Sequence, residues 1–280
     1  MRHLTSEQLA QTYKNACIGE LQALKPGNVH VFADGHGMTI HDFIKSADAS
    51  AAVIAQPDLS VGKRIYSAID ATQKAVGLNT NLGLVLLCAP LIQAALDGDS
   101  AQSLEENLNT VLSCLSINDA ILTAQAIVMA NPAGLGSVST HDVHQPPKVT
   151  LLEMMRSAQH QDFIALQYAN NFSDILGFGL QRYDEAMAKW QNQAWATTAV
   201  YLGFVSRQLD THIVRKYGNG VAEAVMVEAQ TMEAAHWVAE NPKLIQKQLL
   251  EWDASLKERN LNPGTSADLT VATLLAGLLV

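Results

Sequence analysis

The sequence predicts an all-α protein: a single compact domain, residues 1–280, in which many helices surround a buried apolar helix. Apolar residues recur at helical spacing through most of the chain, and capping residues precede them. There is no convincing run of alternating β-branched residues that would indicate a strand. Residues 84–91 are apolar on every side, and a helix of that kind must be covered on all faces.

Capping and breaking residues place the helices along the chain. Ser6 or Thr5 opens the first helix, which we expect to reach about Leu24 because Pro26 cannot continue it. Asn118-Asp119 is expected to separate two helices, and Thr150 to Glu153 has the form of a capping box. The expected helices after the first are 39–56, 60–76, the central apolar helix, 101–115, 118–130, a short helix from 150, a longer one from 162, 190–209, 211–216, 221–240, 242–258 and 267–280.

Composition limits the classes of function. The net charge is -9, with no Lys/Arg run, which argues against general nucleic-acid binding. Cys17, Cys88 and Cys114 form no Cys-x-x-Cys pair, so we expect buried, reduced thiols in a cytoplasmic protein. The apolar segment 267–280 is too short for a membrane span, which needs roughly 20 residues. Only 16% of residues are charged, a low fraction that is compatible with a homodimer interface.

Common catalytic motifs are missing. Gly134-Leu135-Gly136 lacks the third glycine of a dinucleotide fingerprint, and Gly62-Lys63-Arg64 lacks the upstream glycine and the following Ser or Thr of a P-loop. No His-Glu-x-x-His or Gly-x-Ser-x-Gly motif is present.

Five polar segments nevertheless carry more chemistry than a helix connection needs. Each also has a purely structural interpretation, as a helix stop, a cap or a solvated helix face. Residues 79–83 could present free N–H groups to phosphate at the start of the apolar helix. His212, Arg215 and Lys216 fall on one helix face, which suggests an anion site. The other three segments are 25–36, with a lysine and two histidines; 141–148, followed by a helix on which Gln167, Asn171 and Asp174 form one polar stripe; and 262–268, a glycine turn into a helix.

Taken together, these segments resemble the triphosphoribosyl-dephospho-CoA synthase family. The matching pieces occur in the family's order and span almost the whole chain: Glu20 through Lys25-Pro26-Gly27-Asn28-Val29-His30, Asn79-Thr80-Asn81-Leu82-Gly83, Asp210-Thr211-His212 with Arg215-Lys216-Tyr217-Gly218, and Asn262-Pro263-Gly264-Thr265-Ser266-Ala267-Asp268. The stretch from Gly134 to Ala169 resembles a divergent branch. In the better-known branch, Leu, Asp and His stand where this sequence has Asn28, His30 and Asn81.

The resemblance implies an all-α transferase that moves the 5-triphosphoribosyl group of ATP to the 2′-hydroxyl of 3′-dephospho-CoA and releases adenine. The product is a prosthetic-group precursor. Such a reaction needs a carboxylate near the sugar, a base for the acceptor hydroxyl and a proton for adenine. It also needs cationic groups for the triphosphate, together with Mg²⁺ on oxygen ligands.

On this basis we assign candidate site residues. Those expected to bind ATP are Lys25, Gly27, Asn28, His36, Asn79, Asn81, Arg215, Lys216, Gly264 and Ser266. The expected catalytic residues are Asp142, His144, Asp210 and His212, with His36 as a further candidate proton carrier. Asp174 and Asp268 are the expected metal ligands. Two alternatives stay open: the same chemistry on another cofactor precursor, and a non-catalytic helical nucleotide-binding protein.

Overall fold

A computed structural model describes residues 4–132 and 145–280. Within these ranges it consists of helices and two isolated β-bridges, without a strand. The prediction of an all-α fold is therefore confirmed. The α-helices are α1 Ser6–Leu21, α2 Ile40–Ile54, α3 Val61–Val76, α4 Leu82–Asp97, α5 Leu104–Ser113, α6 Ile117–Ala130, α7 Leu151–Ala158, α8 Phe163–Ala169, α9 Leu180–Trp190, α10 Gln193–Arg207, α11 Thr211–Tyr217, α12 Asn219–Val238, α13 Gln246–Glu258 and α14 Gly264–Leu279. A π-helix, η1 Asp174–Gly179, precedes α9, and a 3-10 helix, η2 Pro242–Ile245, precedes α13.

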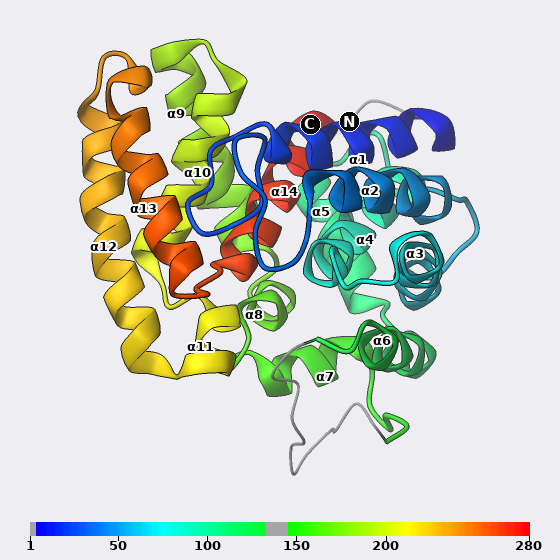
Figure 1. The fold of residues 1–280 in the computed structure, drawn as a ribbon. Helices are drawn as coiled ribbons and strands as arrows, with labels where there is room; N and C mark the ends of the chain where they lie inside the picture. The colour runs from blue at the N-terminus through cyan, green and yellow to red at the C-terminus, as the bar shows by residue number, and fades with distance from the viewer. Residues whose placement is uncertain (1–3, 133–144) are drawn as a thin grey trace.

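The helices form two groups on either side of α14 (Figure 1). Helices α1 to α7 lie on one side, where the largest apolar cluster surrounds α4. Helices α9, α10, α12 and α13 lie on the other, and a second cluster joins α10, α12 and α13. Because α14 packs against α1, α4 and α10, its N-terminal residues lie where the two groups meet.

Helix α4 is the buried apolar helix that the sequence predicts. Leu82 and all residues from Leu84 to Ile92 are buried. Pro90 lies inside this helix and has no N–H, so the carbonyl of Leu86 lacks its usual helical partner. The hydroxyl of Tyr168 on α8 donates to that carbonyl at 2.6 Å. A second helix thus satisfies the polar group that proline leaves in the core.

The segment after Asp162 differs from its prediction. Asp162 does cap α8, but that helix ends at Ala169, and Asn171 and Phe172 have φ of 57° and 59°. Asn171 therefore leaves the expected helical stripe, because the left-handed region interrupts a right-handed helix. Gln167 and Asp174 still meet, since the Gln167 amide donates to the Asp174 carboxylate at 2.8 Å.

Other helix boundaries shift by smaller amounts. The break expected at Asn118-Asp119 is wrong: Ser116 is the N-cap of α6, and Asp119 completes its capping box. The first helix ends at Leu21, before the position expected, and 242–258 begins as a 3-10 turn.

The exposure of the cysteines and the length of the apolar helices bear on two of the predictions. Cys17 and Cys88 are buried as predicted, whereas Cys114 is exposed because it ends α5. Taken singly, no helix in the described ranges is long and apolar enough to cross a membrane; the bent pair α5 and α6 meets that test only when joined.

Candidate active site

The junction between α11 and α14 is built on the carboxylate of Asp210. One oxygen accepts the backbone N–H groups of His212 at 3.0 Å and Ile213 at 3.3 Å, and thereby caps α11. The other oxygen accepts the N–H and the hydroxyl of Ser266 on α14, both at 2.8 Å. Pro263 offers no capping side chain to α14, so Asp210 supplies the cap from another part of the chain. Burial raises the pKa of Asp210, and the bonds from Ser266 oppose that shift.

His212 packs directly on the glycine turn that begins α14. A Cβ atom on Gly264 would lie 2.6 Å from Nδ1 of His212, so any larger residue would displace the imidazole. Burial, together with the nearby cations Lys216 and Arg215, lowers the pKa of His212 to about 3. Its Nε2 atom is buried without a hydrogen-bond partner in the described part of the chain. His212 is therefore a neutral imidazole with one nitrogen available.

The loop after α1 carries a buried ion pair. The Lys25 ammonium group contacts the carboxylate of Glu20 and donates to Asn28 Oδ1 at 3.1 Å. Asn28 in turn donates to Asn262 Oδ1 at 2.8 Å, which ties this loop to the segment before α14. Burial is the largest influence on both charged groups, and it raises the pKa of Glu20 and lowers that of Lys25. The lysine expected to face phosphate thus lies inside the protein, against a carboxylate.

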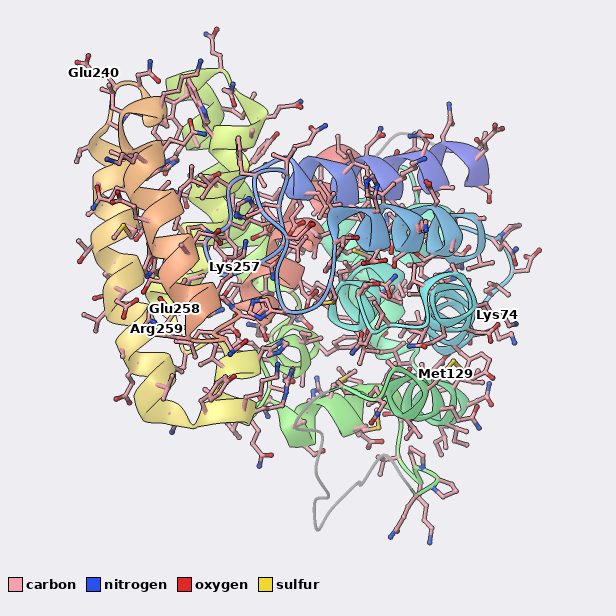
Figure 2. All side chains as sticks on the ribbon, in the orientation of Figure 1. Lys74, Met129, Glu240, Lys257, Glu258 and Arg259 are labelled. Atoms are coloured by element: carbon pink, nitrogen blue, oxygen red, sulfur yellow. The ribbon has the colours of Figure 1, made fainter. Side chains whose placement is uncertain are left out.

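Asp253 on α13 fixes the same loop from outside. Its carboxylate accepts the N–H of Gly27 at 2.8 Å and lies 3.3 Å from Nε2 of His30. The ammonium group of Lys257 donates to the same carboxylate at 3.0 Å. Lys257 also donates to the carbonyl of Ala33 at 3.1 Å, and Figure 2 shows it on α13 beside this loop. Nε2 of His36 is 2.8 Å from the carbonyl oxygen of Gly27. The loop conformation is therefore set by residues more than 200 positions away in the sequence.

Asp268 is half-buried and lies against the start of α4. A Cβ atom on Gly83 would lie 2.0 Å from Oδ2 of Asp268, so glycine is required for this approach. The N–H of Leu84 donates to the Asp268 carboxylate. Burial, followed by repulsion from Glu20 and Asp210, nevertheless raises the pKa of Asp268 well above its usual range. The carboxylates of Glu20 and Asp268 thus both act on the ammonium group of Lys25, and Asp268 is also repelled by Asp210.

The two asparagines before α4 have different roles. Asn79 Oδ1 accepts the N–H of Leu82 at 3.3 Å and acts as a cap. Asn81 is buried and directs its amide nitrogen to Thr72 Oγ1 at 2.8 Å and Ser50 Oγ at 3.4 Å. Its Oδ1 atom has no donor among the described residues.

The remaining predicted residues lie elsewhere or outside the described ranges. Arg215 pairs with Asp162 at 2.6 Å, and Lys216 is exposed. Gln167 and Asn170 hold the carboxylate of Asp174 at 2.8 and 2.9 Å. In residues 4–132 and 145–280 no group of three or more His, Cys, Asp or Glu side chains is arranged to hold a metal ion. Asp142 and His144 lie outside the described residues.

Sequence reasoning missed three residues that organise the site: Glu20, Asp253 and Asn262. Glu20 had a local signal, because it is a carboxylate on the apolar face of α1 with Tyr13, Cys17 and Leu21. Asn262 lies inside a recognised segment but was not selected. Asp253 had no local signal, since an acidic residue on an amphipathic helix is ordinary.

Comparison with known proteins identifies the fold and the family of this chain. No curated protein sequence matches the chain. A crystal structure described as a triphosphoribosyl-dephospho-CoA synthase from Archaeoglobus fulgidus has the same fold, with a TM-score of 0.64 and 20% identity over 85% of this chain and 97% of that chain. Residues 6–280 match the family model of ATP:dephospho-CoA triphosphoribosyl transferase, which includes every segment described above. The chain therefore belongs to the ATP:dephospho-CoA triphosphoribosyl transferase family and is a transferase of triphosphoribosyl groups from ATP to dephospho-CoA.

Proposed function

We propose that the reaction takes place at the buried cluster of Glu20, Lys25, Asp210 and Asp268, where α4 and α14 begin. The observation that supports this most directly is convergence. Four segments that are far apart in the sequence, 20–30, 79–83, 210–216 and 262–268, contribute groups to one charged cluster. Helix caps alone would not require the carboxylates of Glu20 and Asp268 to lie close to the buried ammonium group of Lys25.

The chemistry assigns different tasks to these groups. The bond between ribose C1′ and adenine N9 breaks, and a bond forms between C1′ and the oxygen of the acceptor's 2′-hydroxyl. The acceptor hydroxyl loses one proton and the departing adenine gains one, so no net proton is released or consumed. The sugar gains oxocarbenium character, which nearby carboxylates stabilise. We assign that task to Asp268 and Glu20, because Asp268 lies against Gly83 and Glu20 lines a cavity together with Leu84, so both are at the start of α4.

His212 is suited to accept the hydroxyl proton once ATP is bound. The cations Lys216 and Arg215 contribute to its lowered pKa. A triphosphate beside those cations would offset their charge and raise the pKa of the imidazole toward the working range. Asp210 acts by position, since it holds the backbone of His212 and Ser266.

Magnesium fits the donor set around Asp268. Carboxylate oxygens are ligands that Mg²⁺ prefers, usually one or two of them together with phosphate oxygens and water. Repulsion from Glu20 and Asp210 contributes to the raised pKa of Asp268, and a divalent cation bound there would oppose that shift. When bound, the metal would supply charge stabilisation to the triphosphate. Asp174, held by two amides, remains a second candidate ligand.

The same chemistry on a different acceptor is the second candidate function. It is motivated by Asn28, His30 and Asn81, which depart from the better-known branch. Asn28 bonds Lys25 and Asn262, and His30 lies against Asp253, so both side chains turn inward. These contacts fix the loop itself, so the two departures do not by themselves indicate another acceptor.

Two further expectations belong to this proposal. We infer a homodimer from the low charge fraction and from Val227, Val238 and Leu244, which are 58%, 77% and 78% exposed on α12 and η2. Light scattering that gives the mass of a monomer at all concentrations would refute it. We also expect the enzyme to act in the cytoplasm.

The decisive experiment supplies ATP, Mg²⁺ and dephospho-CoA and measures free adenine together with the mass of the product. Adenine and the triphosphoribosyl adduct in equal amounts are the expected result. Release of adenine only with another acceptor would favour the second candidate. Absence of adenine with every acceptor tested would refute the proposed chemistry at this cluster.

A further inference from the structure

A small cavity lies behind the charged cluster, between α1, α2, α14 and the start of α4. It encloses about 20 Å³, which is enough for one water molecule or one hydroxyl group. Its walls are largely apolar and include Phe43, Leu84 and Val271. The lining side chains that carry polar groups are Tyr13, whose hydroxyl bonds Ser50, and Cys17, Glu20, Ser46 and Asn81. A cavity of this size beside a reaction centre selects for one small polar group.

Asn81 presents a fixed hydrogen-bond acceptor at this cavity. Its amide nitrogen is held by Thr72 and Ser50, so the orientation of the amide is determined and Oδ1 is on the opposite side. Oδ1 has no donor among the described residues, although Asn81 is only 4% exposed. A buried acceptor without a donor is costly, so a ligand that brings a donor is favoured.

Glu20 adds a second acceptor to the cavity wall. Lys25 contacts one of its two oxygens, and the carboxylate also lines the cavity. Ser46 is engaged already, since its hydroxyl bonds the carbonyl of Asp42 at 2.6 Å. The cavity thus offers acceptors from Glu20 and Asn81 to a single small donor.

We propose that this cavity receives the 2′-hydroxyl of the ribose of ATP. The proposal rests on the proposed site at the start of α4, because a triphosphate bound there would bring its ribose to Glu20 and Leu84. A hydroxyl group matches the cavity in size and can donate to Asn81 Oδ1. The 2′-hydroxyl is adjacent to C1′, and hydrogen bonds to that hydroxyl strengthen as the sugar gains oxocarbenium character. Asn81 is therefore a specificity-determining residue for a ribonucleotide.

The test compares ATP with 2′-deoxyATP in the wild type, Asn81→Leu and Asn81→Asp. Removing a 2′-hydroxyl also makes the glycosidic bond weaker, so the relevant quantity is the change in the ratio of kcat/KM values between variants. We expect Asn81→Leu to reduce the preference for ATP by about tenfold or more, almost entirely through loss with ATP. Asn81→Asp keeps an acceptor and should keep most of the preference.

Controls separate this proposal from the proposed function. With 3′-deoxyATP in place of 2′-deoxyATP, Asn81→Leu should leave the preference relative to ATP unchanged. If Asn81→Leu does not fold, as judged by thermal unfolding, Asn81→Ala removes the acceptor with less steric change. An equal loss with ATP and 2′-deoxyATP in the folded variant would overturn the assignment of the cavity. Absence of adenine release by the wild type with every nucleotide would instead refute the proposed function.

Discussion

The two ends of the charged cluster differ in how completely their polar groups are bonded. At the α11–α14 junction, Asp210 accepts four hydrogen bonds, two on each oxygen. At the start of α4, Asp268 receives a bond from Leu84, and Oδ1 of Asn81 has no donor among the described residues. Asp210 and Asn81 are 3% and 4% exposed, and Asp268 is half-buried, so exposure to water does not explain the missing donor at Asn81.

The contrast distinguishes carboxylates that position the backbone from carboxylates that can act on the substrate. A carboxylate whose oxygens are fully bonded stabilises the backbone around it and has little capacity for a substrate. A buried carboxylate with few donors carries a free-energy cost that a cation or a developing positive charge can relieve. We therefore expect substitutions at the two ends to affect activity and stability in different proportions.

Asp268→Asn should have the largest effect on activity. Because burial raises the pKa of Asp268 well above that of an unfolded carboxyl, the folded state holds its proton more tightly and loses stability as the pH rises toward neutrality. The amide removes that cost, so the free energy of unfolding at pH 7 should stay the same or increase. Adenine release should fall by about 100- to 1000-fold, as for loss of one electrostatic contact to the transition state.

Adenine release and urea unfolding at pH 7 measure the two quantities on the same preparation. If Asp268→Asn lowers the free energy of unfolding by more than about 1 kcal/mol, Asp268 is a structural group like Asp210, and the proposed difference between the two ends is wrong.

Asp210→Asn should lower both the free energy of unfolding and the rate of adenine release. An amide cannot accept all four donors, so at least one buried N–H or hydroxyl at the α11–α14 junction loses its partner. We expect a loss of about 1 to 3 kcal/mol in the free energy of unfolding, measured by urea titration. Activity should fall with it, because His212 loses its fixed backbone.

Asp162→Asn is the matched control. Asp162 also caps a helix, through the N–H groups of Ile164 and Ala165, but its carboxylate is partly exposed and asparagine is an equally good cap. If Asp162→Asn lowered the free energy of unfolding as much as Asp210→Asn does, the burial of the Asp210 cap would not matter for stability.

Local sequence signals were sufficient for most of the fold. Ser60 and Gly77 bound α3 where expected, and the apolar run of α4 is buried, because caps and continuous apolarity act within a few residues. The prediction of one longer helix after Asp162 was wrong for the opposite reason. Asn171 and Phe172 lie in the left-handed region, which asparagine tolerates but a phenylalanine rarely adopts. Phe172 is fully buried, with its ring centroid 5.5 Å from that of Tyr168, and this packing is not visible in the local pattern.

The candidate site was predictable in its segments but less so in its contacts. Lys25, Asp210 and Asp268 stand in recognisable motifs, whereas their partners Glu20, Asn262 and Asp253 were selected by the fold. Whether Lys25 faces a phosphate or a carboxylate depends on a residue five positions earlier on α1. The sequence shows that both residues are present but gives no distance between them.

Two buried histidines test whether an unbonded nitrogen by itself indicates function. His212 lies in the cluster, and His236 lies outside it, with an edge contact to Trp190 at a ring-centroid distance of 4.8 Å. Each has one buried nitrogen without a partner in the described ranges. Burial is the main cause that lowers the pKa of His212 to about 3 and that of His236 to about 4.

Both histidines should therefore destabilise the protein in acid. Between pH 6.5 and these folded-state values the unfolded chain takes a proton that the folded chain does not, so stability is lost as the pH falls. From pH 7 to pH 5 each histidine should account for about 2 kcal/mol of the loss, which His212→Asn and His236→Asn should each remove in urea titrations at the two pH values. Of these two variants, only His212→Asn should lower adenine release, by about 100-fold, as for loss of a general base. Equal activity of the two variants would mean that the unbonded nitrogen of His212 has no catalytic role.

Arg215→Ala should have the smallest effect and concerns the exposed edge of the cluster. Its partner Asp162 is on the surface, so loss of this ion pair should change the free energy of unfolding by less than about 1 kcal/mol. If Arg215 leaves Asp162 to bind the triphosphate, KM for ATP should rise by about tenfold while kcat changes little, because the contact would exist in both ground and transition states. Asp162→Asn should then lower KM for ATP, since it releases the same guanidinium group. Opposite shifts of KM in these two variants would extend the substrate-binding surface from the buried carboxylates to α11, whereas unchanged values in both would restrict it to the start of α4.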